Sequence, residues 1–174
     1  MRLVLNALGF QIAWWACVAG VGNGFEVPAL LLACALVGLH LFFAPRPQDD
    51  MQLAAVALVV GLLIDTGLQA ASVIRFYGWA WGPLSPFWLW LLWILFAMTL
   101  NTSLAFLQTK PLWLSALAGA VFGPLTYYAG AQLGAASLNN SLIQIGALAL
   151  AWMLALPFLV YTAQHLSNTH QGQP

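Results

Sequence analysis

The stretch VALVVGLLIDTGLQAASVI, residues 56–74, decides the fold class. Apart from Asp65 near its middle it carries no charge, and it approaches the roughly 20 residues of helix that cross the hydrocarbon core of a bilayer. The rest of the chain is similar: 63% of its 174 residues are apolar, 5% are charged, and the mean hydropathy is +0.90. Because about a quarter of the residues in soluble domains are charged, this composition indicates an integral membrane protein.

Six apolar runs separated by turn-forming residues predict an all-α polytopic membrane protein, a bundle of six transmembrane helices. The runs cover residues 3–21, 28–43, 51–74, 86–107, 111–131 and 141–162. We expect one transmembrane domain, residues 1–163, followed by a short polar C-terminal tail, residues 164–174. Helix-start chemistry supports the divisions, because Pro28, Pro86 and Pro111 suit first helical positions and Asp49 and Asp50 suit the positive end of the third helix.

The few positive charges predict the orientation. With six spans both termini lie on one side, and the loops on that side carry Arg2, Arg46 and Lys110 against only Arg75 on the other. Cytoplasmic loops are enriched in Lys and Arg. We therefore expect a multi-pass protein of the bacterial inner membrane with both termini in the cytoplasm. Five of the nine tryptophans fall in residues 76–93, where we expect them to anchor the outer membrane interface.

Asp65 is the candidate centre of a functional site. A carboxylate at mid-membrane is costly unless it is protonated, paired, or facing water and protein, so partners should lie at its depth. Counting about 1.5 Å per helical residue places Gln11, Thr99 and Asn101 near the same plane. Gln69 and Tyr127 lie slightly nearer the outer face. The predicted ligand-binding residues are Asp65, Gln69, Gln11, Thr99, Asn101 and Tyr127.

This polar layer has two interpretations. In the first, Asp65 is a protonated hydrogen-bond donor that fastens the helices together, which in membranes stabilises by roughly 0.5–2 kcal/mol. In the second, the layer is a ligand or proton site, since intramembrane acids are functional candidates by default. The sequence leaves both open.

Other kinds of site find little support. No histidine is expected near the midplane to activate a serine nucleophile or to join Asp65 in binding zinc. His40 with Asp49 and Asp50 is more typical of a solvated helix end than of a metal site. A net charge of zero without any basic run argues against nucleic acid as a partner. We therefore predict no metal and no cofactor.

Several motifs carry a family resemblance. They are NALGFQIAWWACVAG at residues 6–20, LLIDTGLQ at 62–69, SPFWLWLLWILFAMTLNTSLAFL at 85–107 and AGAVFGPLTYYAGAQLGA at 118–135. In these the chain resembles the domain-of-unknown-function 2878 family, small integral membrane proteins of proteobacteria. The resemblance implies an inner-membrane protein and brings no reaction, cofactor or catalytic residue. Members tend to be encoded beside enzymes that modify fatty acyl chains, which favours lipid handling.

From these observations we predict a protein that binds or moves a membrane lipid or small amphipathic molecule at a mid-membrane polar site. Asp65 and Gln69 would contact the polar head, and the tryptophan-rich edge would guide the apolar part. One alternative is an enzyme, or enzyme subunit, of lipid modification with Asp65 in proton transfer. Another is a structural assembly partner that uses the G-x-x-x-G faces at Gly119 and Gly123 and at Gly130 and Gly134. The sequence does not specify the oligomeric state.

Overall fold

The structure, a computed structural model, describes residues 1–139 and 141–171, with the side chains of residues 168–171 left out. Within this part the chain forms six α-helices, one 3₁₀ helix and a two-stranded sheet. The elements are α1 (Arg2–Gly22), α2 (Glu26–Phe43), α3 (Pro47–Ala70), β1 (Arg75–Phe76), α4 (Phe87–Leu100), η1 (Ala105–Thr109), α5 (Leu112–Gln132), β2 (Ala136–Ser137) and α6 (Leu142–Gln171).

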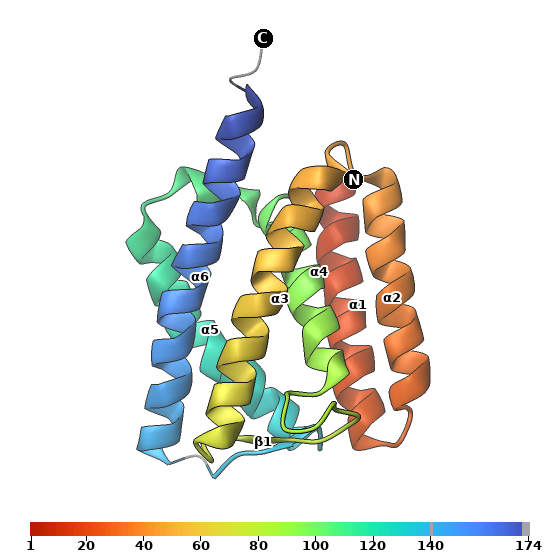
Figure 1. Ribbon diagram of the computed structural model, residues 1–174, viewed down its shortest axis with the longest axis vertical. Coiled ribbons are helices and arrows are strands. Elements are labelled where there is room, and N and C mark those ends of the chain that lie inside the picture. The colour runs from red at the N-terminus through yellow and green to blue at the C-terminus, as the bar shows by residue number, and fades with distance from the viewer. Residues whose placement is uncertain (140, 172–174) are drawn as a thin grey trace.

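The predicted six-helix bundle is confirmed. Five helices are long and apolar enough to cross a membrane, and α4 is a shorter apolar helix. α4 contacts α1, α2, α3 and α6, while α5 packs chiefly on α6. In Figure 1, α1 and α2 lie on one side and α5 and α6 on the other, with α3 and α4 between them. α1 begins at the same end of the bundle at which α6 ends, and we call this the N-terminal end.

The prediction for the fourth span was wrong at its C-terminal side. It was expected to run through residues 86–107, but α4 ends at Leu100 and the chain turns before η1. Polar side chains explain the end, because they offer the backbone partners other than the next helical turn. The Ser103 backbone N–H donates to Asn6 Oδ1 on α1 at 3.2 Å, and the Thr99 hydroxyl donates to the Phe96 carbonyl at 2.6 Å.

The third span is displaced by one turn from its predicted bounds, residues 51–74. Pro47 occupies the first turn of α3 and places Asp49 and Asp50 there too, as helix-start chemistry favours. The helix then ends at Ala70 because Ser72 adopts a left-handed conformation with φ of 56°. At the other end of the chain, α6 continues to Gln171, through most of the predicted tail. Residues 172–174 of that tail lie outside the described part.

The end of the bundle opposite the N-terminus is closed by a short antiparallel pairing of β1 with β2, in which Arg75 pairs with Ser137. Glu26 at the start of α2 holds the connection from β1 to α4, because its carboxylate accepts a hydrogen bond of 2.7 Å from the Trp79 backbone N–H. Gly78 permits this approach: its φ is +111°, and a Cβ there would lie 2.7 Å from Glu26 Oε1. This connection therefore forms a fixed cap.

Both G-x-x-x-G pairs are used inside the chain. A Cβ on Gly119 would lie 2.2 Å from the Trp152 carbonyl oxygen, and one on Gly123 would lie 2.3 Å from the Trp152 ring. The pair therefore lets α5 approach α6 closely. Gly134 lies against Gly22 at the end of α1, with 3.3 Å between its Cβ position and the Gly22 Cα. These faces are occupied by the protein's own helices, which weakens the assembly-partner alternative.

Candidate functional site

Asp65 joins three helices at the centre of the bundle. Its side chain on α3 is completely buried, with 0% exposure. Oδ2 accepts a hydrogen bond of 2.8 Å from Trp93 Nε1 on α4, and Oδ1 accepts one of 2.5 Å from the Tyr127 hydroxyl on α5. The carboxyl group is thus shielded from lipid, which is the condition for its presence at this depth.

The local sequence of α3 makes the Trp93 contact possible. Gly61 lies one helical turn before Asp65 and therefore on the same face of α3. A Cβ on Gly61 would lie 2.2 Å from the Trp93 ring, so the missing side chain is where the indole rests. On its other side the Trp93 ring stacks on Trp152 of α6, with centroids 4.7 Å apart and an interplanar angle of 11°. The indole is held between two helices while its N–H reaches Asp65.

The two hydrogen bonds to Asp65 differ in what they permit. An indole N–H can only donate, so Oδ2 is fixed as an acceptor. A tyrosine hydroxyl both donates and accepts. The proton in the hydrogen bond between Tyr127 and Oδ1 can therefore belong either to the hydroxyl or to the carboxyl group. Among the described residues no Lys, Arg or His forms an ion pair with Asp65. The arrangement therefore suits either a carboxylate with two donors or a neutral acid donating to Tyr127.

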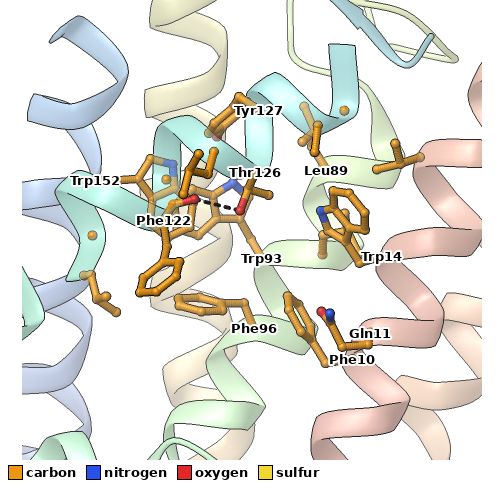
Figure 2. Close-up of a pocket in the computed structure, with 18 of the residues that line it drawn as sticks. Phe10, Gln11, Trp14, Leu89, Trp93, Phe96, Phe122, Thr126, Tyr127 and Trp152 are labelled. Atoms are coloured by element: carbon orange, nitrogen blue, oxygen red, sulfur yellow. Dashed lines mark hydrogen bonds between the residues drawn. The ribbon is translucent and has the colours of Figure 1, made fainter. Parts of the chain in front are cut away.

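An apolar cavity of about 540 Å³ lies beside this cluster, between α1, α4, α5 and residues 104–107. Figure 2 shows Phe10, Gln11 and Trp14 of α1 facing Phe122 and Tyr127 of α5 across it. Trp93, Tyr127 and Trp152 form part of its wall, whereas Asp65 is not among the lining residues. The partners of the carboxylate therefore separate it from the cavity.

Polar groups in the cavity wall are few. The Thr126 hydroxyl donates to the Phe122 carbonyl one turn earlier at 2.8 Å, as drawn in Figure 2, so its proton is used within α5. The Trp152 indole N–H is buried, and no described residue offers it an acceptor in hydrogen-bond geometry. Gln11 is exposed near the middle of α1, and its amide forms no hydrogen bond with any described residue. Gln11 therefore presents an unpartnered amide at membrane depth.

The structure divides the predicted site residues among several places. Gln11 and Tyr127 line the cavity, and Tyr127 also contacts Asp65. Gln69 lies near the end of α3 and accepts from the Phe76 backbone at 3.2 Å, so it holds β1. Thr99 is buried and, as described above, bonded to its own helix. Neither Gln69 nor Thr99 hydrogen-bonds to Asp65, and their role in ligand binding stays a prediction.

Asn101 is the clearest correction. Its side-chain amide donates to Asp50 Oδ1 at 2.9 Å. Asp50 and Asp65 are fifteen residues apart on one helix, which corresponds to about 22 Å. The error follows from the fourth span: because α4 is shorter than expected, Asn101 lies at the N-terminal end of the bundle and not at mid-membrane.

A hydrogen-bond network at that end was not predicted. Asn6 Oδ1 accepts from the Ser103 hydroxyl at 2.6 Å, and its amide nitrogen lies 3.3 Å from His40 Nδ1. His40 Nε2 lies 3.0 Å from Asp50 Oδ2. The sequence put His40 near Asp49 and Asp50 but gave no signal linking them to Asn6 or Ser103, because the turn after Leu100 creates that contact.

Comparison with known proteins agrees with the motifs. Residues 3–158 match the model of a family described as protein of unknown function (DUF2878). The chain belongs to this family. No curated protein and no solved structure gives a significant match.

The site chemistry of this DUF2878 protein is restricted by its geometry. Asp65 has no direct contact with the cavity, so a molecule bound there would meet Tyr127 and Trp93 first. Within the described residues no group of three or more His, Cys, Asp or Glu side chains is arranged to hold a metal ion. The groups available to a ligand are an apolar wall, the Gln11 amide and the aromatic edges.

Proposed function

We propose that the protein binds a membrane lipid or similar amphipathic molecule and accommodates its apolar part in the cavity between α1, α4 and α5. The observation that carries the proposal is the cavity itself, about 540 Å³ and lined almost entirely by apolar and aromatic side chains. Pockets that bind small molecules span about 300–1,000 Å³ and combine an apolar lining with few polar groups. The size and lining therefore suit a hydrocarbon chain.

The cavity has a route from the bilayer. Its lining includes Phe106, Phe122 and Leu125, which are more than half exposed on the surface that lipid would cover, Phe122 at 66%. α1 and α5 are not among the helix pairs with substantial contact, so the space between them is not closed by packing. A lipid could therefore enter sideways without first crossing water.

Gln11 supports an amphipathic ligand over pure hydrocarbon. An amide in the membrane interior without a hydrogen-bond partner costs free energy, in contrast to the other polar groups of the bundle, which are mostly bonded. A carbonyl or hydroxyl of a bound lipid would satisfy this amide. In this proposal Asp65 acts indirectly, because its hydrogen bonds position Trp93 and Tyr127 in the cavity wall.

One structural observation favours the alternative that the protein is an enzyme. Tyr127 contacts the carboxyl group on one side and the cavity on the other, so a proton could pass between Asp65 and a bound molecule through its hydroxyl. Lipid binding is the preferred proposal because the described part of the wall offers Tyr127 no second acid or base, and the Thr126 hydroxyl beside it is bonded within α5.

We further infer an inner-membrane location with the N-terminal end in the cytoplasm. Arg2, Arg46 and Lys110 are at or near helix starts at that end, and Arg75 is in β1 at the opposite end. This distribution supports the orientation through the enrichment of Lys and Arg in cytoplasmic loops. Reporter fusions after residues 44 and 80 would test it, because the first is expected inside and the second outside.

The test of lipid binding is a cavity-filling variant with a matched control. Ala129 lines the cavity, and Ala35 lies exposed on α2 away from it. Ala129→Phe should lower retained lipid per protein by roughly 5- to 100-fold, since overfilling costs about 1–3 kcal/mol. Ala35→Phe should retain lipid like the unmodified protein. Lipid content is measured by mass spectrometry after detergent extraction, and equal lipid content in the two variants would rule out this cavity.

A further inference from the structure

A second cavity, of about 600 Å³, lies at the N-terminal end of the bundle and differs in character from the first. Its charged and amide lining comes from the start of α1, the start of α3, the turn after α4 and the 3₁₀ helix η1. These residues are Arg2, Arg46, Asp49, Asp50, Asn101 and Gln108. A cavity lined by both signs of charge requires a ligand of matching chemistry.

Asp50 supplies a buried negative charge to this cavity. It is only 4% exposed, and its two oxygens accept hydrogen bonds from His40 and Asn101. The orientation of the Asn6 amide follows from the Ser103 backbone N–H, which can only donate and donates to Asn6 Oδ1. The amide nitrogen of Asn6 therefore faces His40 Nδ1 and donates to it. An imidazole that accepts at Nδ1 and donates at Nε2 is neutral. In this network Asp50 is therefore hydrogen-bonded by uncharged groups.

The guanidinium groups do not balance that charge. Among the described residues neither Arg2 nor Arg46 forms an ion pair with Asp50. Arg2 donates to the Phe43 carbonyl, and the side chain of exposed Arg46 makes no hydrogen bond or ion pair with the described part of the chain. Buried carboxylates are usually paired with a cation, and guanidinium groups suit phosphate. Among the described residues, Asp50 and the two guanidinium groups therefore line one cavity without forming ion pairs with one another.

The two cavities meet at one short segment. Between residues 101 and 108, Leu104, Phe106 and Leu107 line the apolar cavity, whereas Asn101, Thr102 and Gln108 line the polar one. The turn that ends α4 thus presents apolar side chains to one cavity and polar side chains to the other. A molecule with a charged head and an apolar chain could occupy both by passing this segment.

We propose that the polar cavity binds the zwitterionic headgroup of an aminophospholipid, namely a phosphoethanolamine group. Arg2 and Arg46 bind the phosphate, and Asp50, which retains free lone pairs after accepting two hydrogen bonds, binds the ammonium. The lipid's chain lies in the apolar cavity, and this part rests on the proposed function. The headgroup is thus recognised at the N-terminal end and not at Asp65.

The experiment measures binding of three phospholipids with identical acyl chains to the delipidated, detergent-solubilised full chain by native mass spectrometry. The Kd of phosphatidylethanolamine should be at least about five-fold lower than the Kd of either of the other two lipids. Phosphatidylcholine has a phosphate but no ammonium N–H to donate, and phosphatidylglycerol has a phosphate but no ammonium. A further arm uses soluble phosphoethanolamine, which should bind far more weakly. Equal binding of the three lipids overturns the assignment of the headgroup. If soluble phosphoethanolamine binds as tightly as phosphatidylethanolamine, the proposal that the ligand is a lipid is overturned.

Arg46→Gln provides the variant, because the Arg46 side chain is exposed and has no partner in the described part of the chain, so we expect the variant to fold. We expect phosphatidylethanolamine binding to weaken about five-fold. Lys110→Gln is the matched control, since it removes a cation at the same end that does not line the cavity. Equal effects of both variants overturn the proposal. If Ala129→Phe keeps its lipid while Arg46→Gln still weakens phosphatidylethanolamine binding, the chain cavity fails and the headgroup site stands.

Discussion

The indole N–H of Trp93 donates a hydrogen bond of 2.8 Å to the carboxyl group of Asp65, and the ring packs on α3 where Gly61 has no side chain. This contact links α3 to α4, and the hydroxyl of Tyr127 extends the link to α5. The carboxyl group therefore connects three helices, and it also positions two aromatic side chains that line the apolar cavity. These two bonds agree with the interpretation that Asp65 fastens helices, and the interpretation as a ligand or proton site stays a prediction.

Gly61→Ala should destabilise the protein by about 1–3 kcal/mol, because the added methyl group would overlap the Trp93 ring and displace it from Asp65. Thermal unfolding in detergent measures the effect. Gly67→Ala on the same helix is the control: its Cβ would meet nothing within 4 Å. That change should stabilise by about 0.5–1 kcal/mol through helix propensity. Equal shifts for both variants would contradict the packing of Trp93 on α3.

Asp65→Leu and Asp65→Asn should differ in stability. Leucine leaves the Trp93 N–H and the Tyr127 hydroxyl without their acceptor, at a cost of about 1–3 kcal/mol. Asparagine can accept from Trp93 through its carbonyl and donate to Tyr127 through its amide, so its loss should stay below about 1 kcal/mol. Unfolding temperatures of the two variants decide this. A leucine variant as stable as the unmodified protein would show that the carboxyl group does not fasten the helices.

The fold was predictable because its determinants are local in sequence. Apolar runs of spanning length and prolines at helix starts located the starts of six helices to within a few residues. The errors arose where a tertiary contact overrode the pattern. α4 stops early because Asn6, almost a hundred residues earlier, offers the Ser103 backbone an acceptor. Hydropathy cannot report a partner on another helix.

The candidate site was predictable only in part. Asp65 was found because a charge in an apolar run is conspicuous, and Tyr127 because counting along its helix placed it near the depth of Asp65. Trp93 was assigned to interface anchoring, as composition alone favours. Its role depends on Gly61 lying one turn before Asp65, a spacing that gains meaning only once α3 and α4 are known to be neighbours. The hydrogen-bond network at the N-terminal end of the bundle could not be predicted, because the expected length of α4 was wrong.

Gly123→Ala should separate α5 from α6. A Cβ at this position would lie 2.3 Å from the Trp152 ring, so the stacked pair of Trp152 and Trp93 must shift. We expect a loss of about 1–3 kcal/mol in the free energy of unfolding, measured by chemical denaturation in detergent. Gly146→Ala on α6 meets nothing within 4 Å and should be neutral or slightly stabilising. A neutral Gly123→Ala would mean that the helices do not pack this closely.

Tyr127→Phe separates lipid binding from proton chemistry. The variant keeps the ring in the cavity wall but removes the hydroxyl that donates to Asp65, so it should lose about 0.5–2 kcal/mol of stability. It should retain lipid as well as the unmodified protein does, because the hydroxyl is engaged with Asp65 and the ring supplies the cavity surface. A double-mutant cycle with Asp65→Asn measures the coupling between the two side chains. Coupling near zero would contradict the hydrogen bond, whereas loss of bound lipid without loss of stability would show that the hydroxyl contacts the ligand and favour the enzyme alternative.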